Sequence, residues 1–355
     1  MRNYDWPLIG AVAFIALTGL LNLYSVEPEL FSRQVAWVLL GMAAIFLLPI
    51  INLKPFFSYR WAILGVYAAS LLLLLAAFFF APTIANTKSW LVFGGFNLQP
   101  SEFAKIALII LLSSFFAAKH IAIRRVSIVI ASFVYFALPA GLVLLQPDLG
   151  TVIILFAIWF GYLLLSEIPL RNIGFMLLIF VVVAALAWGF ALQDYQKERI
   201  IGLFNPEYDP LGINYSVIQS KIAIGSAGFF GKGFGQGTQS QLGFLPEKGN
   251  DFAFAAFVEE WGILGGLVLV SAFVFMIYRM LYLGLRSDNN FSKLLTLGTV
   301  VMLLAHFAIN VGSNLGLFPV VGVGFPFLSY GGSNLLTSAL LIGIILNTAK
   351  RRSGY

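Results

Sequence analysis

The sequence Gly231-Lys-Gly-Phe-Gly-Gln-Gly-Thr-Gln-Ser-Gln-Leu-Gly-Phe-Leu-Pro-Glu-Lys-Gly-Asn-Asp251 is polar and rich in glycine. It is followed at once by Phe252-Ala-Phe-Ala-Ala-Phe-Val-Glu-Glu-Trp261, where an apolar helix is predicted to begin. Most of the remaining chain consists of apolar runs that suit a lipid bilayer. Long polar loops in such a chain are where chemistry can meet water, so this boundary is the first place to look for a site.

Composition indicates a polytopic membrane protein. The chain is 60% hydrophobic and 10% charged, with a mean hydropathy of +0.94, whereas globular domains carry about a quarter charged residues. It has no cysteine, which excludes disulfides and thiolate metal sites, and its two histidines argue against a multi-histidine metal site. The net charge of +6 falls on no soluble basic domain, so we expect no nucleic-acid partner and assign the charge to cytoplasmic loops.

Apolar runs predict about ten membrane-spanning helices, because a span needs about 20 apolar residues. The predicted fold is therefore an all-α polytopic integral membrane protein, with residues 1–355 as a single domain. Between the last two spans, the segment from Gly316 to Pro326 is predicted to be irregular or re-entrant, which is tolerated where it lines protein or water. The predicted spans are residues 6–25, 34–52, 62–81, 100–118, 127–146, 149–166, 172–193, 251–278, 293–314 and 328–348.

Lysine and arginine set the predicted orientation, because they accumulate in cytoplasmic segments. With the N-terminus inside, only Arg33 and Lys88 fall in short outside segments. Both termini are therefore predicted to be cytoplasmic, and the long loop over residues 194–250, between the seventh and eighth spans, is predicted to be extracytoplasmic. The basic residues of the inside segments are Arg2, Lys54, Arg60, Lys119, Arg124, Arg125, Arg171, Arg279, Arg286, Lys293, Lys350, Arg351 and Arg352.

Charged residues within spans are costly and commonly functional. Glu102 and Lys105 are three residues apart on one predicted helix and so share a face. They either neutralise each other so that the helix can insert, or they serve a polar cavity. Pro100 fits the first turn of that helix, Ser101 is predicted to help cap it, and Asp148 is predicted to cap the sixth span.

Asp251 has two interpretations that the residues alone leave nearly equal. It can cap the helix that follows, where the helix dipole would keep it ionised, or it can be a carboxylate base at the membrane–water boundary. Glu259 and Glu260 lie about two turns deeper and point about 100° apart. This spacing predicts that one of them faces a cavity and the other a partner helix or a polar group.

The long loop carries basic residues that could meet an anion. Tyr215 to Gly225 is predicted to form an amphipathic helix on the membrane, and it includes Lys221. Glycines surround Lys232, and exposed backbone amides beside a lysine can cradle a phosphate. The spacing and the absence of a preceding strand do not fit a nucleotide P-loop.

Several short motifs follow one another from about Lys88 to the C-terminus: Gln99-Pro-Ser-Glu-Phe-Ala-Lys105, Gln146-Pro-Asp-Leu-Gly-Thr151, Gly225-Ser-Ala-Gly228, Gly231-Lys-Gly233, Phe244-Leu-Pro-Glu247 with Asp251-Phe252, and Phe327-Leu-Ser-Tyr-Gly-Gly-Ser333. Together these motifs resemble the SEDS family (shape, elongation, division and sporulation), and the stretch before Asp251 is most similar to the rod-shape member. The family's essential aspartate falls on Asp251, and family positions of functional importance fall on Glu102 and Lys105. The sequence departs from the family pattern at Gly249-Asn250, where His-Thr is usual.

The resemblance implies a peptidoglycan glycosyltransferase of the bacterial cytoplasmic membrane. Such an enzyme polymerises lipid II outside the membrane for cell-wall elongation, in partnership with a class B penicillin-binding protein. We expect inverting transfer with Asp251 as the general base and undecaprenyl pyrophosphate as the leaving group. Lys105, Lys232, Lys221 and Arg199 are the candidates for holding the pyrophosphate, Glu102 would orient Lys105, and a divalent cation such as Mg²⁺ is an alternative source of positive charge.

Two other functional classes stay open. A lipid II flippase would also need many spans and a polar cavity containing Glu102 and Lys105, but it would have no specific need for an outward carboxylate at Asp251. A non-catalytic scaffold for a penicillin-binding protein would tolerate the loss of every intramembrane charge that does not affect folding.

Overall fold

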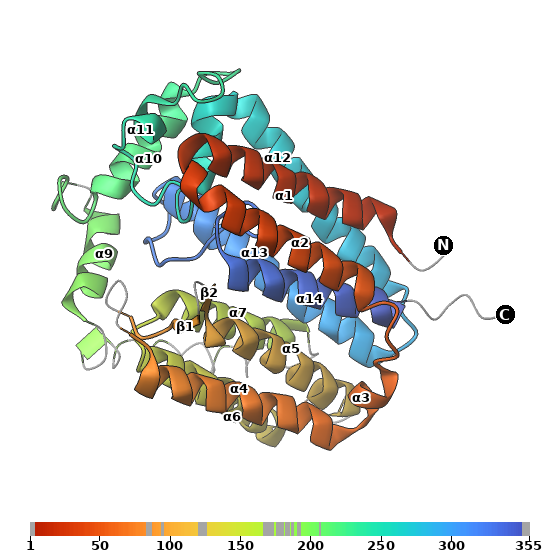
Figure 1. Cartoon of the computed structure of the whole chain (residues 1–355). Helices are drawn as coiled ribbons and strands as arrows, with labels where there is room; N and C mark the ends of the chain where they lie inside the picture. The colour runs from red at the N-terminus through yellow and green to blue at the C-terminus, as the bar shows by residue number, and fades with distance from the viewer. Residues whose placement is uncertain are drawn as a thin grey trace. The chain divides into compact units, whose positions relative to one another are not determined.

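The computed structural model of the chain describes residues 4–82, 87–93, 96–119, 126–165, 193–205 and 207–349, with isolated residues at 174, 181, 185, 188 and 189. The described chain is predominantly helical and divides into two compact units (Figure 1). Unit 1 contains Met1–Leu48, Tyr195–Tyr282 and Leu303–Gly343. Unit 2 contains Pro49–Asp194, Leu283–Met302 and Ile344–Tyr355.

Unit 2 is built around the helix that carries Glu102 and Lys105. This helix, α5, packs against its neighbours α4, α6 and α7, and its span is the most buried of those in the described chain. Burial on several sides explains its almost continuous apolar sequence after the first turn. The elements of the unit are α3 (Lys54–Ser58), α4 (Arg60–Phe80), β1 (Leu91–Phe93), β2 (Phe96–Leu98), α5 (Pro100–Lys119), α6 (Val126–Leu144), α7 (Leu149–Leu165) and the first part of α13 (Asn290–Asn314).

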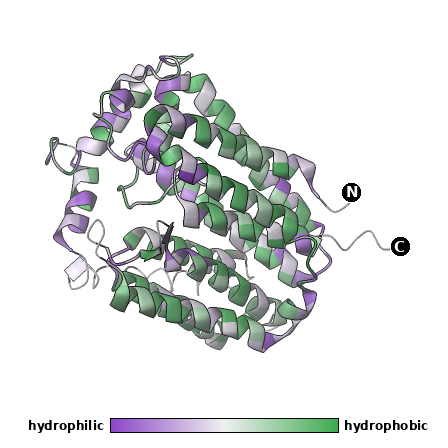
Figure 2. Ribbon diagram, viewed as in Figure 1, coloured by the Kyte–Doolittle hydropathy of each residue, from purple (hydrophilic) through white to green (hydrophobic). Residues whose placement is uncertain are grey.

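Unit 1 combines spanning helices with the short helices of the long polar segment. Its elements are α1 (Trp6–Val26), α2 (Pro28–Leu47), α9 (Asp194–Phe204), α10 (Tyr215–Ser226), α11 (Thr238–Gln241), most of α12 (Ala253–Leu285), the end of α13 and most of α14 (Gly332–Ala349). In Figure 2 the spanning helices are mainly hydrophobic, and hydrophilic residues gather on α10, α11 and the loops beside them. The helix predicted from Tyr215 is confirmed as α10, and its position on the membrane stays a prediction.

The predicted spans agree closely with the helices. Eight described helices are long and apolar enough to cross a membrane, and α7 is a shorter apolar helix. The second predicted span is displaced, since α2 runs from Pro28 to Leu47 rather than over 34–52; proline suits a first helical turn, and Pro49 follows its end. The span predicted at 172–193 lies almost entirely outside the described residues. The polytopic all-α class is confirmed, and the membrane orientation stays a prediction.

Local signals at helix ends gave mixed results. Asp148 caps α7 as predicted, because its Oδ1 accepts the Thr151 N–H at 3.0 Å. The Ser101 prediction is wrong: its hydroxyl is buried and has no hydrogen-bond partner among the described residues. The short antiparallel hairpin of β1 and β2, with Leu91 opposite Leu98, was not predicted. The irregular segment predicted between the last two spans is confirmed between α13 and α14.

Helix α12 is broken at Gly262, which has φ 73° and ψ −179°. Residues 228–233, which we call the strap, enter this break and complete the backbone hydrogen bonds of α12. The Lys232 and Gly233 N–H groups donate to the carbonyls of Glu259 and Glu260, each at 3.0 Å. The carbonyls of residues 228 and 229 accept the N–H groups of residues 263 and 264, each at 3.1 Å. A helix interrupted inside an apolar region needs such substitutes, because unpaired buried peptide groups are costly.

Candidate active site

Asp251 lies in a tight turn of unit 1, just before α12. The turn begins at Glu247, whose φ is 44° and whose carbonyl accepts the N–H groups of Asn250 at 3.0 Å and Phe252 at 3.1 Å. The Phe252 side chain is buried in a core cluster that includes Val26 of α1. This anchor fixes the turn, while the Asp251 side chain beside it is only partly buried.

The Asp251 carboxylate does not cap α12. Among the described residues none donates a hydrogen bond to it, and the helix begins later, at Ala253. Burial raises the pKa of Asp251 to about 6; the Glu247 carboxylate also raises it, and the Arg199 guanidinium opposes them. The interpretation of Asp251 as a helix cap is wrong, and its interpretation as a carboxylate base stays a prediction. A carboxylate that has a pKa near neutrality and accepts no hydrogen bond from the described residues is suited to general-base chemistry.

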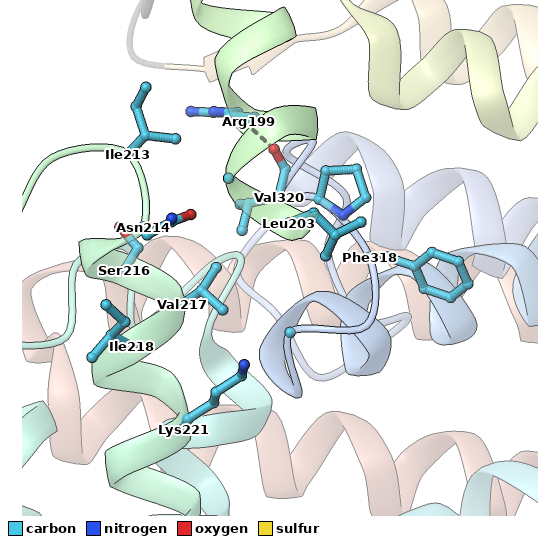
Figure 3. Close-up of a pocket in the computed structure, with 13 residues that line it drawn as sticks. Arg199, Leu203, Ile213, Asn214, Ser216, Val217, Ile218, Lys221, Phe318 and Val320 are labelled. Carbon is cyan, nitrogen blue, oxygen red and sulfur yellow. Dashed lines mark hydrogen bonds between the residues drawn. The ribbon is translucent and has the colours of Figure 1, made fainter. Parts of the chain in front are cut away.

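Arg199 and Lys221 both line one pocket of unit 1, which lies between α9, α10 and the segment that follows α13 (Figure 3). The Arg199 Nη1 donates to the Val320 carbonyl at 2.7 Å, which holds the guanidinium in place. Leu203 and Phe318 supply apolar lining, and both cationic side chains are exposed. A pocket that has two cationic side chains and an apolar lining suits an anionic group attached to a hydrocarbon chain.

Lys232 is part of the fold of the loop rather than of this pocket. Its ammonium donates to the Thr238 hydroxyl and to Glu259 Oε1, both at 2.7 Å. Glu259 is fully buried and also accepts the N–H groups of Gln239 at 2.8 Å and Ser240 at 3.0 Å. The phosphate-cradle role predicted for Lys232 stays a prediction, and it competes with this ion pair.

Glu260, the neighbour of Glu259, also meets protein groups. Its Oε1 accepts hydrogen bonds from the Ser25 hydroxyl and from the Gln241 side-chain amide. Both glutamates therefore fasten α12 to polar groups, which confirms the polar partner predicted for one of them. The cavity predicted for the other stays a prediction.

Glu102 and Lys105 form the predicted pair on α5, in unit 2. The Lys105 ammonium donates to Glu102 Oε1 at 2.6 Å, and both side chains are buried. Glu102 Oε2 is buried and accepts no hydrogen bond from the described residues. The predicted ion pair is confirmed, and its role toward the substrate stays a prediction.

Three further residues beside Asp251 were missed from the sequence. Asn310 and Asn314 of α13 and Ser329 before α14 are buried and donate to the backbone of the turn that carries Asp251. A signal was available, because two asparagines four residues apart in a stretch without charges would share one helix face. Nothing in the local pattern indicated what that face contacts.

Comparison with known proteins places the whole chain in one family. The profile of the family described as cell cycle protein, covering FtsW, RodA and SpoVE, matches residues 5–354. The peptidoglycan glycosyltransferase MrdB of Escherichia coli K12 is 35% identical over 320 residues, covering 90% of this chain and 85% of MrdB. The peptidoglycan glycosyltransferase RodA of Treponema pallidum is 27% identical over 433 residues, covering 99% of each.

Solved structures agree with the sequence relatives. A chain from a peptidoglycan synthase complex that coordinates polymerization and crosslinking aligns with a TM-score of 0.84 and 30% identity, covering 99% of both chains. The crystal structure of Thermus thermophilus RodA aligns with a TM-score of 0.74 and 28% identity, covering 99% of this chain and 98% of that one. Since the family profile and these relatives match nearly the full length, the chain belongs to the FtsW, RodA and SpoVE family of cell cycle proteins.

Proposed function

We propose that this chain is a peptidoglycan glycosyltransferase that polymerises lipid II, with the Asp251 carboxylate as its general base. The enzyme class rests on family membership and on relatives of that name at 35% identity. The observation that carries the residue assignment is the Asp251 carboxylate itself. It accepts no hydrogen bond from the described residues, and its surroundings raise its pKa to about 6.

The chemical step is an inverting displacement. The 4-hydroxyl oxygen of an acceptor GlcNAc attacks the anomeric carbon of a donor MurNAc, and the new glycosidic bond forms as the bond to undecaprenyl pyrophosphate breaks. The hydroxyl proton passes to Asp251, which contributes about 10²–10⁴-fold to the rate, as a positioned base typically does. Pyrophosphate is already a good leaving group, so the reaction needs no separate acid.

Arg199 and Lys221 are the residues that we assign to the departing pyrophosphate. Positive charge aimed at a developing anion stabilises the transition state more than the ground state. The apolar lining of the same pocket suits the first carbons of a lipid tail. Arg199 also influences the pKa of Asp251, so the base and the anion site are electrostatically coupled.

A divalent cation such as Mg²⁺ would enter with the substrate. The described residues contain no group of three or more His, Cys, Asp or Glu side chains that could hold a metal ion. Mg²⁺ commonly binds through substrate phosphates and few protein ligands. In this chain it would add to the positive charge of Arg199 and Lys221 at the pyrophosphate.

The cellular setting follows from the same chemistry. The enzyme would lie in the bacterial cytoplasmic membrane with Asp251 on the outer side, where the apolar helices meet the two lipid tails. Its partner would be a class B penicillin-binding protein, which cross-links the peptides of the new glycan. The structural relative in a complex that coordinates polymerization and crosslinking supports this pairing.

The deciding experiment is polymerisation of labelled lipid II by the purified protein, alone and with a class B penicillin-binding protein. Wild type should form glycan strands, and Asp251→Ala should form none while it accumulates as folded protein. Glu29→Gln, at an exposed carboxylate of α2, is the control for removal of a charge. Polymer from Asp251→Ala would remove the base assignment.

The same preparation separates the two rival functions. A flippase would move labelled lipid II across vesicles without joining it. A scaffold would stimulate a partner's polymerisation equally well with Asp251→Ala as with wild type.

A further inference from the structure

Three consecutive carbonyls in the turn that carries Asp251 are held by groups from distant parts of unit 1. The Gly249 carbonyl accepts the Tyr330 N–H at 2.8 Å. The Asn250 carbonyl accepts the Ser329 hydroxyl at 2.7 Å. The Asp251 carbonyl accepts two side-chain amides, from Asn310 at 2.9 Å and from Asn314 at 2.8 Å. Both lone pairs of that one carbonyl are therefore occupied.

The two asparagines use every N–H donor of their side-chain amides, while the Oδ1 of Asn310 is buried without a hydrogen-bond partner among the described residues. Both side chains are fully buried in the structure. Asn310 Nδ2 also donates to the Val323 carbonyl at 2.9 Å, and Asn314 Nδ2 also donates to the Asn310 carbonyl at 2.8 Å. A side-chain amide has two N–H donors, so each amide uses both. With both donors engaged, each buried amide is restricted to one orientation.

Asn314 also replaces a hydrogen bond of the first turn of α12. In a regular helix, the Ala255 N–H would donate to the Asp251 carbonyl, four residues earlier. Instead, the Ala255 N–H donates to Asn314 Oδ1 at 3.0 Å, while Asn314 Nδ2 donates to the Asp251 carbonyl. The inserted amide keeps Asp251 outside the helix. This geometry explains why its carboxylate does not become an ordinary cap.

We infer that Asn310 and Asn314 are positioning residues for the Asp251 carboxylate, an inference that rests on the proposed role of Asp251 as base. They act through the main chain and do not touch the side chain that reacts. Their effect is to hold the turn so that the carboxylate stays unoccupied and partly desolvated. Without Asn314, the turn can close into the helix, and the carboxylate can then cap it or gain water.

The test compares Asn314→Ala and Asn310→Ala with Ser313→Ala in lipid II polymerisation. Ser313 is a matched control, since it is buried on the same helix and donates to the Asn310 carbonyl at 2.8 Å. Asn314→Ala should lower kcat by about 10- to 100-fold, the scale of a misplaced catalytic group, with KM within about twofold of wild type. The acid limb of the pH profile of Asn314→Ala should lie at lower pH than that of wild type, because the Asp251 carboxylate then gains contact with solvent or with helix N–H groups.

Two results would overturn the inference. The first is a wild-type kcat in Asn314→Ala. The second is that Asn314→Ala and Ser313→Ala, at equal thermal stability, lose the same amount of activity and the acid limb of the pH profile of Asn314→Ala does not move. Should Asn314→Ala not accumulate as folded protein, Asn310→Ala and Ser329→Ala decide the question by the same readouts. Asp251→Ala is assayed in parallel, and polymer from that variant would refute the base assignment itself rather than the positioning role.

Discussion

Asp251 and Glu259 stand at the two ends of one short helical segment, and their surroundings are opposite. Glu259 is fully buried and accepts hydrogen bonds from Lys232, Thr238, Gln239 and Ser240. Asp251 is partly exposed and, among the described residues, accepts none at its carboxylate. The protein instead places its donors on the carbonyl of Asp251. Where the donors point therefore separates a carboxylate that holds the fold from one that is left available to react.

The largest effect that tests this comparison is expected at Glu259. Glu259→Gln removes the charge that neutralises Lys232 and leaves buried donors poorly matched, so the free energy of unfolding should fall by about 3 kcal/mol. Polymerisation per folded molecule should stay near the wild-type value. The measurement is denaturant unfolding in detergent beside the assay, with Glu29→Gln as the control. An unchanged unfolding midpoint together with lost polymerisation would place Glu259 in the reaction and break the distinction.

The second effect concerns the pH dependence of kcat. A general base must be deprotonated, so activity should fall as the pH drops through the pKa of Asp251, about 6. Glu247→Gln removes a negative charge and should move this acid limb to lower pH. Arg199→Gln removes a positive charge and should move it to higher pH, each by up to about one pH unit. Opposite shifts would sharpen the assignment, and shifts in one common direction would contradict it.

The smallest effect is on stability. The pKa of Asp251 is raised on folding from 3.8 to about 6, so the folded state binds the proton more tightly than the unfolded state. Its stabilising contribution is complete below the unfolded value and is lost as the pH rises through the folded one. Wild type should therefore lose stability relative to Asp251→Asn between about pH 4 and pH 6. A gain over that window would mean that the carboxylate is stabilised in its charged form, like Glu259.

The sequence predicted the features that depend on neighbours along the chain. Apolar runs located the spans, the turn formers located the break after α13, and the loop–helix boundary located Asp251. The spacing of Glu102 and Lys105 correctly predicted an ion pair, because residues three apart on a helix must share a face.

The features that were missed depend on contacts between distant residues. Asn310 and Asn314 meet Asp251 across about sixty positions, and the Lys232–Glu259 pair also joins separate segments. Hydropathy cannot show which carbonyl a buried amide will meet. The raised pKa of Asp251 was not predicted for the same reason, because it depends on how the folded chain buries the carboxylate.

The break at Gly262 limits how the sequence of this region can change. A side chain at Gly262 would collide with the backbone of the strap at Gly231, and a side chain at Gly231 would collide with the carbonyl of Glu260. Both glycines also have positive φ, which other residues rarely adopt. Because each collision is with main chain, no replacement of a neighbouring side chain can relieve it. The contact between Gly231 and Gly262 therefore has no compensating mutation. A library that varies the strap together with position 262 should recover glycine at both positions.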